Sequence, residues 1–519
     1  MTSAAQASQG AAVTTGLRGL DGGGLAPLRD RTVWSDGTVA AAGLRVQPVP
    51  FMTIGRGLAS FALVVFLRNC GVPAGEIRVI SPQPRAYENF HHLMRRSQIL
   101  ETDPLRSDSM SRVDNIWGFP SYAIDRSMAR RSLRPMWNVL TEPVATEFFN
   151  PTGSEVFRGI DREAMRIGWP SMLLAGRGRL VRKREGGGYF CLVCPADGSP
   201  TVVLRSQFVH LGTGYPAVNY PREVSDYRVR YHDYFRVVNA YEPHEHVYQV
   251  LLRRSGTVVV RGSGITASRV LERLFDDRER SGRDVQILHL IRSYADGPQG
   301  PPMFRRPGGD GWSHQAFSFP KAAGAGQLRH RMLGMDNARR AEYIASIGGT
   351  TSAKRRLWQR QLARGRSGGY YRAYRGDICD MTPGSHGTVE LRVDVAALPG
   401  EARLEADFVI DCTGLKLALR ENPLMSDLLD TSGAGQNPAG GLDVGPDFEV
   451  RGTEQPPGQM YATGVIARGG YLAPVDSFWG FSHAALLICD DLARRGFCRR
   501  FGVTRSVAGW LKWLRNAAP

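Results

Sequence analysis

The sequence lacks the features that place a chain across a membrane. It contains no uninterrupted apolar run of about 18 residues, so no segment is predicted to span a bilayer. The first residues also lack the basic and then apolar pattern of a secretory signal peptide. We therefore expect a cytoplasmic protein that has no membrane partner.

Cysteine is scarce, and its placement does not indicate a disulfide framework. The chain has seven cysteines, an odd number without a secretion signal. Cys191 and Cys194 form a C-x-x-C pair, but the surrounding "GYFCLVC" is typical of a strand, whereas a redox pair normally begins a helix. His232, Asp233 and residues 244–246 could bind a metal, but no paired ligand group follows them. No metal site is predicted.

Glycine and positive charge are plentiful. The 519 residues include 60 glycines, and 42% of the residues are apolar, which fits two or three globular domains with many tight turns. The formal charge of +17 indicates either an ordinary basic surface or attraction of anionic ligands such as dinucleotide phosphates. Because the basic residues are scattered and form no known module, no nucleic-acid partner is predicted.

A glycine turn joins the first predicted strand to a helix. Gly55, Gly57 and Ser60 form a G-x-G-x-x-S pattern after an apolar strand. The first glycine permits the tight turn, the second lets a pyrophosphate approach the helix N-terminus, and the third position must be small. An acidic residue usually follows at the end of the next strand. Ser81 stands there instead, so either Ser81 bonds a ribose hydroxyl or Glu88 folds back to do so.

A second glycine turn repeats this pattern about 200 residues later. Gly262, Gly264 and Ala267 follow the apolar "TVVV" and open an amphipathic helix. Two such units in one chain are much more specific than one. The next strand ends at Arg292 and Ser293. Arg292 is either a surface residue or a partner for a 2′-phosphate, and the second alternative favours NADPH over NADH.

The order of these motifs resembles that of the class B flavin-dependent monooxygenases, which have two dinucleotide-binding domains. Between and after the glycine turns, three strand ends carry Thr-Gly pairs, at Thr213 and Gly214, at Thr413 and Gly414, and in the final "YATG" that ends at Gly464. The resemblance covers roughly residues 47 to 495. It implies an α/β fold with two Rossmann-like dinucleotide-binding domains, the FAD domain discontinuous, and a helical insertion.

The same resemblance suggests domain limits. Residues 46–222 and 395–519 are assigned to the FAD-binding domain, and residues 223–394 to the NAD(P)H-binding domain. A helical insertion at about 335–366 either borders the substrate cleft or is a solvated basic helical pair. Residues 1–45, rich in small residues, are predicted to be a flexible tail.

For activity, the resemblance implies that NADPH reduces FAD, that the reduced flavin takes up O₂ as a C4a-hydroperoxide, and that one oxygen atom enters a small organic substrate. Asp108, Trp117 and Asp476 are candidate flavin neighbours, with Asp108 the candidate catalytic residue. The alternatives are a polar capping loop for Asp108 and core packing for Trp117. The sequence departs from one family fingerprint, because Glu163 stands where a histidine is expected.

Two rival functions stay open. A flavin-dependent dehydrogenase or reductase would pass electrons to an acceptor other than oxygen, although only Cys70 lies where disulfide reductases have a redox pair. A dinucleotide-binding protein without turnover would also fit the missing acid at Ser81. Neither the substrate nor the oligomeric state follows from the sequence. The C-terminal "WLKWLR" is a basic amphipathic stretch that we expect to dock on the protein's own core rather than on a membrane.

Overall fold

The computed structural model describes residues 26–105, 112–117, 120–141, 149–215, 217–292, 327–347, 356–396 and 400–519. Two predicted site residues, Asp108 and Ser293, lie outside these ranges. Within them, no helix combines the length and apolar character needed to cross a bilayer.

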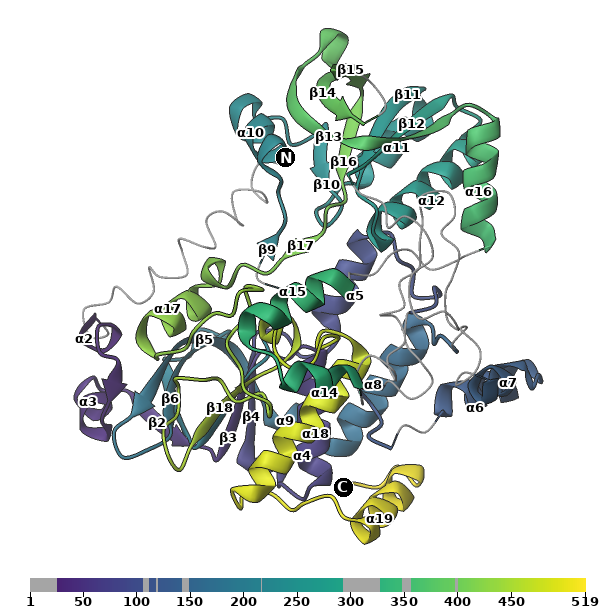
Figure 1. The fold of residues 1–519 in the computed structure, drawn as a ribbon. Coiled ribbons are helices and arrows are strands. Elements are labelled where there is room, and N and C mark those ends of the chain that lie inside the picture. Colours follow the sequence, from purple (N-terminus) through teal and green to yellow (C-terminus); the bar gives the residue numbers. More distant parts are fainter. Residues whose placement is uncertain are drawn as a thin grey trace.

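The strands form two large sheets and one short ribbon (Figure 1). Strands of the first sheet are β1 (Val33–Trp34), β2 (Arg45–Pro48), β3 (Phe51–Ile54), β4 (Ile77–Ser81), β5 (Leu173–Arg184), β6 (Tyr189–Pro195), β7 (Val202–Ser206), β8 (Phe208–Leu211) and β18 (Gln459–Ala462). Strands of the second sheet are β10 (Val237–Asn239), β11 (Gly256–Arg261), β12 (Val285–Ile291), β13 (Tyr371–Pro383), β14 (Val389–Val395), β15 (Glu401–Ala406) and β16 (Phe408–Asp411). The ribbon pairs β9 (Ala217–Val218) with β17 (Leu415–Lys416).

Helices cover both sheets. They are α2 (Ala26–Arg29), α3 (Asp36–Ala41), α4 (Leu58–Asn69), α5 (Glu88–Arg96), α6 (Ser121–Arg130), α7 (Arg134–Thr141), α8 (Gly153–Ile167), α9 (Trp169–Met172), α10 (Arg222–Tyr231), α11 (Glu245–Arg253), α12 (Ile265–Ser281), α14 (Gln327–Leu333), α15 (Asn337–Ile347), α16 (Arg356–Ser367), α17 (Pro423–Thr431), α18 (Phe478–Arg494) and α19 (Val503–Leu514).

The two sheets share one design. In the first, β18, β8, β3, β4 and β5 pair in parallel, and β5, β6 and β7 continue as an antiparallel meander. In the second, β10, β16, β11, β12 and β13 are parallel, and β13, β14 and β15 are antiparallel. Parallel strands that are buried on both faces read as continuous apolar runs, as "FMTI" and "TVVV" do. The predicted fold of two Rossmann-like units is confirmed.

The first sheet draws on both ends of the chain. β18 comes from the C-terminal segment, yet it pairs with β8, whose own partner is β3. Helix α18 then packs along α4, so that α4 has neighbours on every side. All residues of α4 except Arg68 are buried, which explains why its sequence is apolar all round rather than amphipathic. The predicted discontinuity of this domain is therefore confirmed.

The N-terminal segment differs from the prediction of a tail that reaches residue 45. Trp34 lies in β1, which pairs with β5, and its side chain is fully buried. It packs on Phe190, and its indole N–H donates to the carbonyl of Leu28 at 2.8 Å. The buried tryptophan anchors this segment of small residues to the first sheet. The average composition of residues 1–45 gave no indication of this anchor.

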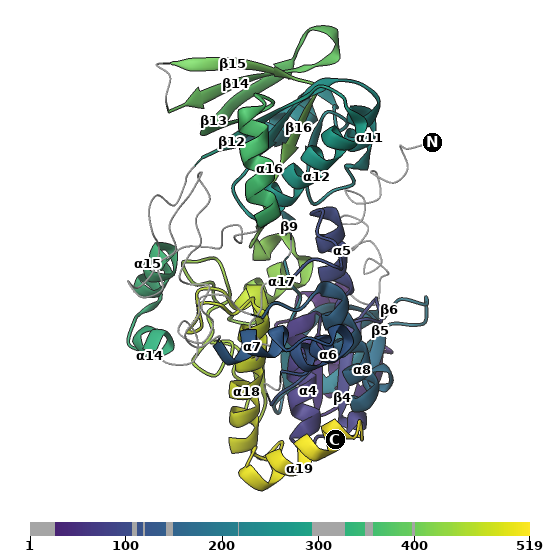
Figure 2. The ribbon, with the colours of Figure 1, turned by 90° about the vertical axis from the view of Figure 1, so that its right-hand side faces the viewer.

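The second sheet also extends beyond residue 394, where the NAD(P)H-binding domain was expected to end. β15 and β16 follow that position and pair with β14 and β11. The chain crosses between the sheets at the short ribbon of β9 and β17, which lies between the two bodies in Figure 1. Of the helices in the predicted insertion, α16 packs on α12 and β13 in the second unit, whereas α15, together with the preceding α14, lies beside the first unit (Figures 1 and 2).

Candidate functional site

The turn after β3 is held against the turn after β8. Gly55 has φ +96°, and a Cβ built on it would lie 2.3 Å from the carbonyl oxygen of Gly212. Only glycine fits this conformation and this approach. Gly57 precedes α4 as its N-cap and has no side chain to cap the first turn. The N–H groups of that turn, at the positive end of the helix dipole, therefore face the space above the glycine turn.

Ser60 lies in the first turn of α4 and is fully buried. Its hydroxyl accepts a hydrogen bond from Thr53 Oγ1 at 3.1 Å, and it packs tightly on Gly212, where an added Cβ would lie 2.2 Å from Ser60 Oγ. A small residue was expected at this position, and α4 does pack closely on the turn after β8 there. Gly214, two residues further, has φ +77° and open space around it.

A buried histidine, which sequence reasoning missed, connects the strands beneath this turn. His210 on β8 has Nδ1 2.7 Å from Thr53 Oγ1 and Nε2 2.7 Å from Thr463 Oγ1. Burial lowers the pKa of His210 to about 3, so the ring is neutral, with one nitrogen donating and the other accepting. The only sequence signal was a lone histidine in the apolar strand "FVHL", just before a Thr-Gly pair.

Gly464 brings a third segment to the same place. It follows Thr463, has φ +73°, and a Cβ on it would lie 3.4 Å from Ala59 Cβ at the start of α4. Residues 55–60, 212–214 and 464 therefore surround the N-terminus of α4, and we call them the first cradle. Three segments that are distant in sequence meet there because β18 adds to the edge of the sheet next to β8.

One acidic residue next to the first cradle is Glu88. Its carboxylate forms an ion pair with buried Arg56, the residue between the two glycines, at 3.0 Å. Ser81 ends β4 and is buried, with its hydroxyl accepting from the Gln83 N–H at 3.3 Å. The structure thus brings Glu88 back to the glycine turn, and a ribose contact by either Ser81 or Glu88 stays a prediction.

The two remaining predicted flavin neighbours, Asp476 and Trp117, lie in different parts of the structure. Asp476 lies just before α18 and accepts a hydrogen bond from the Tyr215 hydroxyl at 3.2 Å, beside the β8 turn. Trp117 instead contacts α19: its indole N–H donates to the Ser506 carbonyl at 3.1 Å, and its ring lies 5.8 Å from that of Trp513. Asp476 therefore adjoins the first cradle, and the role of Trp117 beside a flavin stays a prediction.

The turn after β11 repeats the geometry of the turn after β3. Gly262 has φ +126°, and a Cβ on it would lie 2.8 Å from the Cys412 carbonyl oxygen at the end of β16. Gly264 is the N-cap of α12 and has nothing within 4 Å of an added Cβ, while Ala267 is fully buried. Residues 262–267 with Thr413 and Gly414 form the second cradle.

Polar groups behind the second cradle fix its shape. His289 on β12 lies 2.6 Å from the Gly262 carbonyl and 2.9 Å from the Tyr371 hydroxyl, and burial lowers its pKa to about 4. The Asp411 carboxylate accepts from Thr413 Oγ1 at 2.9 Å, and burial raises its pKa to about 6. A buried histidine thus supports each cradle.

Arg292 directly follows β12, the second strand of this unit. Its side chain is exposed, and no ion pair holds it within the described part of the chain. An exposed guanidinium at this strand end is free to meet a phosphate, so contact with a 2′-phosphate stays a prediction.

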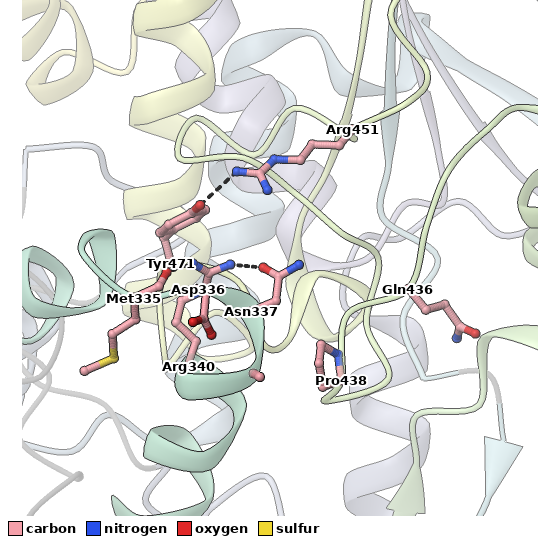
Figure 3. Close-up of a pocket in the computed structure, with 9 residues that line it drawn as sticks. Met335, Asp336, Asn337, Arg340, Gln436, Pro438, Arg451 and Tyr471 are labelled. Carbon is pink, nitrogen blue, oxygen red and sulfur yellow. Dashed lines mark hydrogen bonds between the residues drawn. The ribbon is translucent and has the colours of Figure 1, made fainter.

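A pocket of about 620 Å³ lies between the start of α15 and loops of the first unit (Figure 3). Tyr471 stands between two arginines there: the guanidinium of Arg340 lies 3.9 Å from the ring centroid, and Arg451 Nη2 donates to the Tyr471 hydroxyl at 2.8 Å. The pocket is lined by Met335, Asp336, Asn337, Ala338, Arg340, Gln436, Pro438, Arg451 and Tyr471. Among the described residues of the predicted insertion, those that line it belong to the start of α15 and the two residues before it.

These features define a fold with two dinucleotide-type cradles in one chain. No protein-family model matches the sequence, and no curated protein matches it by sequence. Solved structures do match its fold. Ornithine hydroxylase (PvdA) from Pseudomonas aeruginosa is 16% identical, with 86% of this chain and 100% of that chain covered and a TM-score of 0.62.

Two further solved structures agree. DfoA, the cadaverine monooxygenase from Erwinia amylovora, solved with FAD, is 14% identical over 88% of this chain and 96% of that chain, with a TM-score of 0.62. The ornithine N-hydroxylase KtzI from Kutzneria sp. 744, solved with FADred, NADP⁺ and L-orn, is 14% identical over 87% of this chain and 100% of that chain, with a TM-score of 0.61. The chain therefore has the fold of the N-hydroxylating flavoprotein monooxygenases.

Proposed function

We propose that this protein is an FAD- and NADPH-dependent monooxygenase that hydroxylates a small amine. The observation that carries the proposal is the pair of cradles: each places a glycine turn and an uncapped helix N-terminus at the carboxyl edge of a parallel sheet. That edge is where dinucleotides bind in open α/β sheets. The fold likeness to the hydroxylases named above supports this reading.

The first cradle is the proposed FAD site. The backbone N–H groups at the start of α4 would bind the pyrophosphate, and Gly57 leaves the space for it. Because His210 is neutral and bonded on both sides, it holds β3, β8 and the Thr463 turn in register without adding charge below the phosphates. Asp476 and Tyr215, which are hydrogen-bonded to each other beside the β8 turn, are the proposed contacts of the flavin end.

The second cradle is the proposed NADPH site. The start of α12 would bind that pyrophosphate, and Arg292 would pair with the 2′-phosphate. When bound, the two coenzymes supply hydride transfer and oxygen activation. The residues of the chain would orient the coenzymes and exclude water between them.

The pocket beside Tyr471 is the proposed substrate entrance. The hydroxylases with this fold are named for ornithine and cadaverine, both small amines, and the pocket is of a size that suits a small ligand. Molecular oxygen as co-substrate and a cytoplasmic location belong to the same proposal.

Disulfide reduction fits the structure less well. Cys70 is the C-cap of α4, whereas the first cradle lies at the opposite end of that helix. Twelve residues of helix span about 18 Å, so the Cys70 thiol lies at the end of α4 remote from the proposed FAD site. A dehydrogenase that uses another acceptor remains the alternative.

Purification under air tests the proposal directly. We expect a yellow protein that carries FAD, oxidises NADPH, and consumes oxygen in proportion to a hydroxylated amine when diamines or basic amino acids are supplied. Colourless protein that cannot be reconstituted with FAD would contradict it. NADPH oxidation that needs an artificial acceptor and no oxygen would support the dehydrogenase instead.

A further inference from the structure

Among the described residues, the contacts of helix α19 with the rest of the protein lie on one face. Trp513 packs on Trp117, the Ser506 carbonyl accepts the Trp117 indole N–H, and an added Cβ on Gly509 would lie 3.1 Å from the Trp117 ring. These contacts come from one side of the helix. The C-terminal stretch was expected to dock on the protein's own core, and the inner face of α19 does so.

The outer face of α19 is apolar and open. Val503, Val507, Leu511 and Leu514 are 83%, 52%, 42% and 48% exposed. Their spacing of four, four and three residues places them in one row along the helix. An exposed apolar row on a twelve-residue helix is unusual for a solvated surface and indicates a partner. The helix lies at the end of the molecule remote from the second sheet (Figures 1 and 2).

The chain segment that carries this row has charges of a single sign. From Leu492 to Pro519 the chain has seven arginines and lysines and no aspartate or glutamate. Arg494 and Arg495 pair with acids, and Arg500 lies 4.0 Å from Asp490. Within the described residues, the other four cations of this segment have no acidic partner. These four are Arg499, Arg505, Lys512 and Arg515.

We propose that the outer face of α19 binds an anionic lipid surface, with the apolar row inserted at the interface and the exposed Lys512 and Arg515, next to the C-terminal end of the row, beside the lipid headgroups. An in-plane amphipathic helix combines these two features, an apolar face and flanking basic residues. This inference rests on α19 alone and does not depend on the proposed function.

A second copy of the chain is a poorer occupant. A two-fold interface brings the same patch of each subunit together, so the unpaired cations of one copy would face those of the other. A nucleic acid would attract the cations, but its phosphate backbone offers nothing for the row from Val503 to Leu514. An anionic lipid surface offers a partner for both the apolar row and the cations.

Vesicle sedimentation tests this proposal with the full-length protein. We expect binding to phosphatidylglycerol-containing vesicles, weak binding to pure phosphatidylcholine vesicles, and release by salt. The double variant Val507→Glu/Leu511→Glu should bind at least about tenfold more weakly, because it places two charges in the apolar row. Lys512→Glu/Arg515→Glu should also weaken binding by about tenfold or more.

Helix α10 provides matched controls. Val229 is 63% exposed and Arg222 has a 91% exposed side chain, so Val229→Glu and Arg222→Glu change apolar surface and charge away from α19. Both should bind vesicles like the unchanged protein, and the circular dichroism of every variant should match it.

Four results would overturn the proposal. One is protein that stays in the supernatant with anionic vesicles at low salt. Another is equal loss of binding in the α10 variants. A third is binding to nucleic acid or heparin that matches lipid binding and is unaffected by Val507→Glu/Leu511→Glu. The last is a dimer in solution that the same double variant converts to a monomer.

Discussion

The two cradles repeat one geometry in different surroundings. Both begin with a strand that ends in a positive-φ glycine, and both rest on a buried neutral histidine, His210 or His289. Helix α4 of the first is buried except for Arg68, whereas α12 of the second has a solvated face and begins at exposed Ile265. The first cradle is thus built into the core, and the second is open at its rim.

The number of segments also differs. Gly464 adds a third strand end to the first cradle, while in the described residues the second is formed by the turns after β11 and β16 only. A ligand contacted by three segments loses more contacts when it dissociates than a ligand contacted by two. We therefore expect FAD to copurify with the protein and NADPH to exchange during turnover.

The largest expected effect is on folding in the first cradle. Gly55→Ala should lower the free energy of unfolding by roughly 3 kcal/mol or more, because it adds a side chain at positive φ and forces it against the Gly212 carbonyl. Gly198→Ala is the control, since Gly198 also has positive φ but nothing within 4 Å. Chemical denaturation measures both, and equal losses would show that the contact between the two turns is unimportant.

Gly57→Val should leave the fold intact and lower the flavin content of the purified protein. An added Cβ is 3.7 Å from its nearest neighbour, the Gly212 carbonyl, so the side chain enters the ligand space instead of the protein. Losing one or two charge-assisted hydrogen bonds weakens binding by about ten- to a hundredfold. The flavin-to-protein absorbance ratio gives the result, and stoichiometric flavin in this variant would refute the FAD assignment.

Gly264→Val is the counterpart in the second cradle. An added Cβ there has nothing within 4 Å, so FAD content should be unchanged while the Kd for NADPH rises by about ten- to a hundredfold. Stopped-flow reduction of the bound flavin measures this Kd. Loss of FAD together with NADPH would mean that the two sites are not separate.

The pH dependence of stability distinguishes the buried histidines. The pKa of His210 is about 3 in the folded protein and about 6.5 when unfolded, so the unfolded chain binds the extra proton first and stability falls as the pH drops below about 6.5. Between pH 7 and pH 5, the stability advantage over His210→Gln should shrink by about 2 kcal/mol. His289→Gln should show the same slope, levelling off near pH 4 instead of near pH 3. A pH-independent difference would contradict the burial of the neutral ring.

The smallest expected effect is on coenzyme preference. Arg292→Ala should weaken NADPH binding by about tenfold and leave NADH binding unchanged, because only NADPH carries the 2′-phosphate. The ratio of kcat/KM values for the two coenzymes measures it. Equal changes for both would assign Arg292 to the ordinary basic surface.

Local patterns predicted the turns of this fold well. Gly55 and Gly262 were identified from spacing alone, because a strand, a tight turn and a helix leave a fixed signature in a few adjacent residues. Each has a positive φ and faces the carbonyl of a neighbouring strand end, as that signature requires.

Contacts between distant segments could not be predicted in this way. The bonds of His210 to Thr53 and Thr463, the pairing of Arg56 with Glu88, and the burial of Trp34 all depend on which strands become neighbours. Similarly, the residues that form β15 and β16 were assigned to the FAD-binding domain from the sequence. Their pairing with β14 and β11 places them in the second sheet.

The ribbon of β9 and β17 has a consequence for how the two units communicate. Asn219, just after β9, bonds the Gly414 carbonyl with its N–H and Thr413 Oγ1 with its side chain, at 3.0 and 3.1 Å. Both acceptors belong to the second cradle, so the crossover between the units and the turn after β16 are joined by hydrogen bonds. Rotating one unit against the other would strain that turn. If NADPH binds there as proposed, its binding would bias the rotation by the same free energy, so that coenzyme affinity and domain orientation would change together.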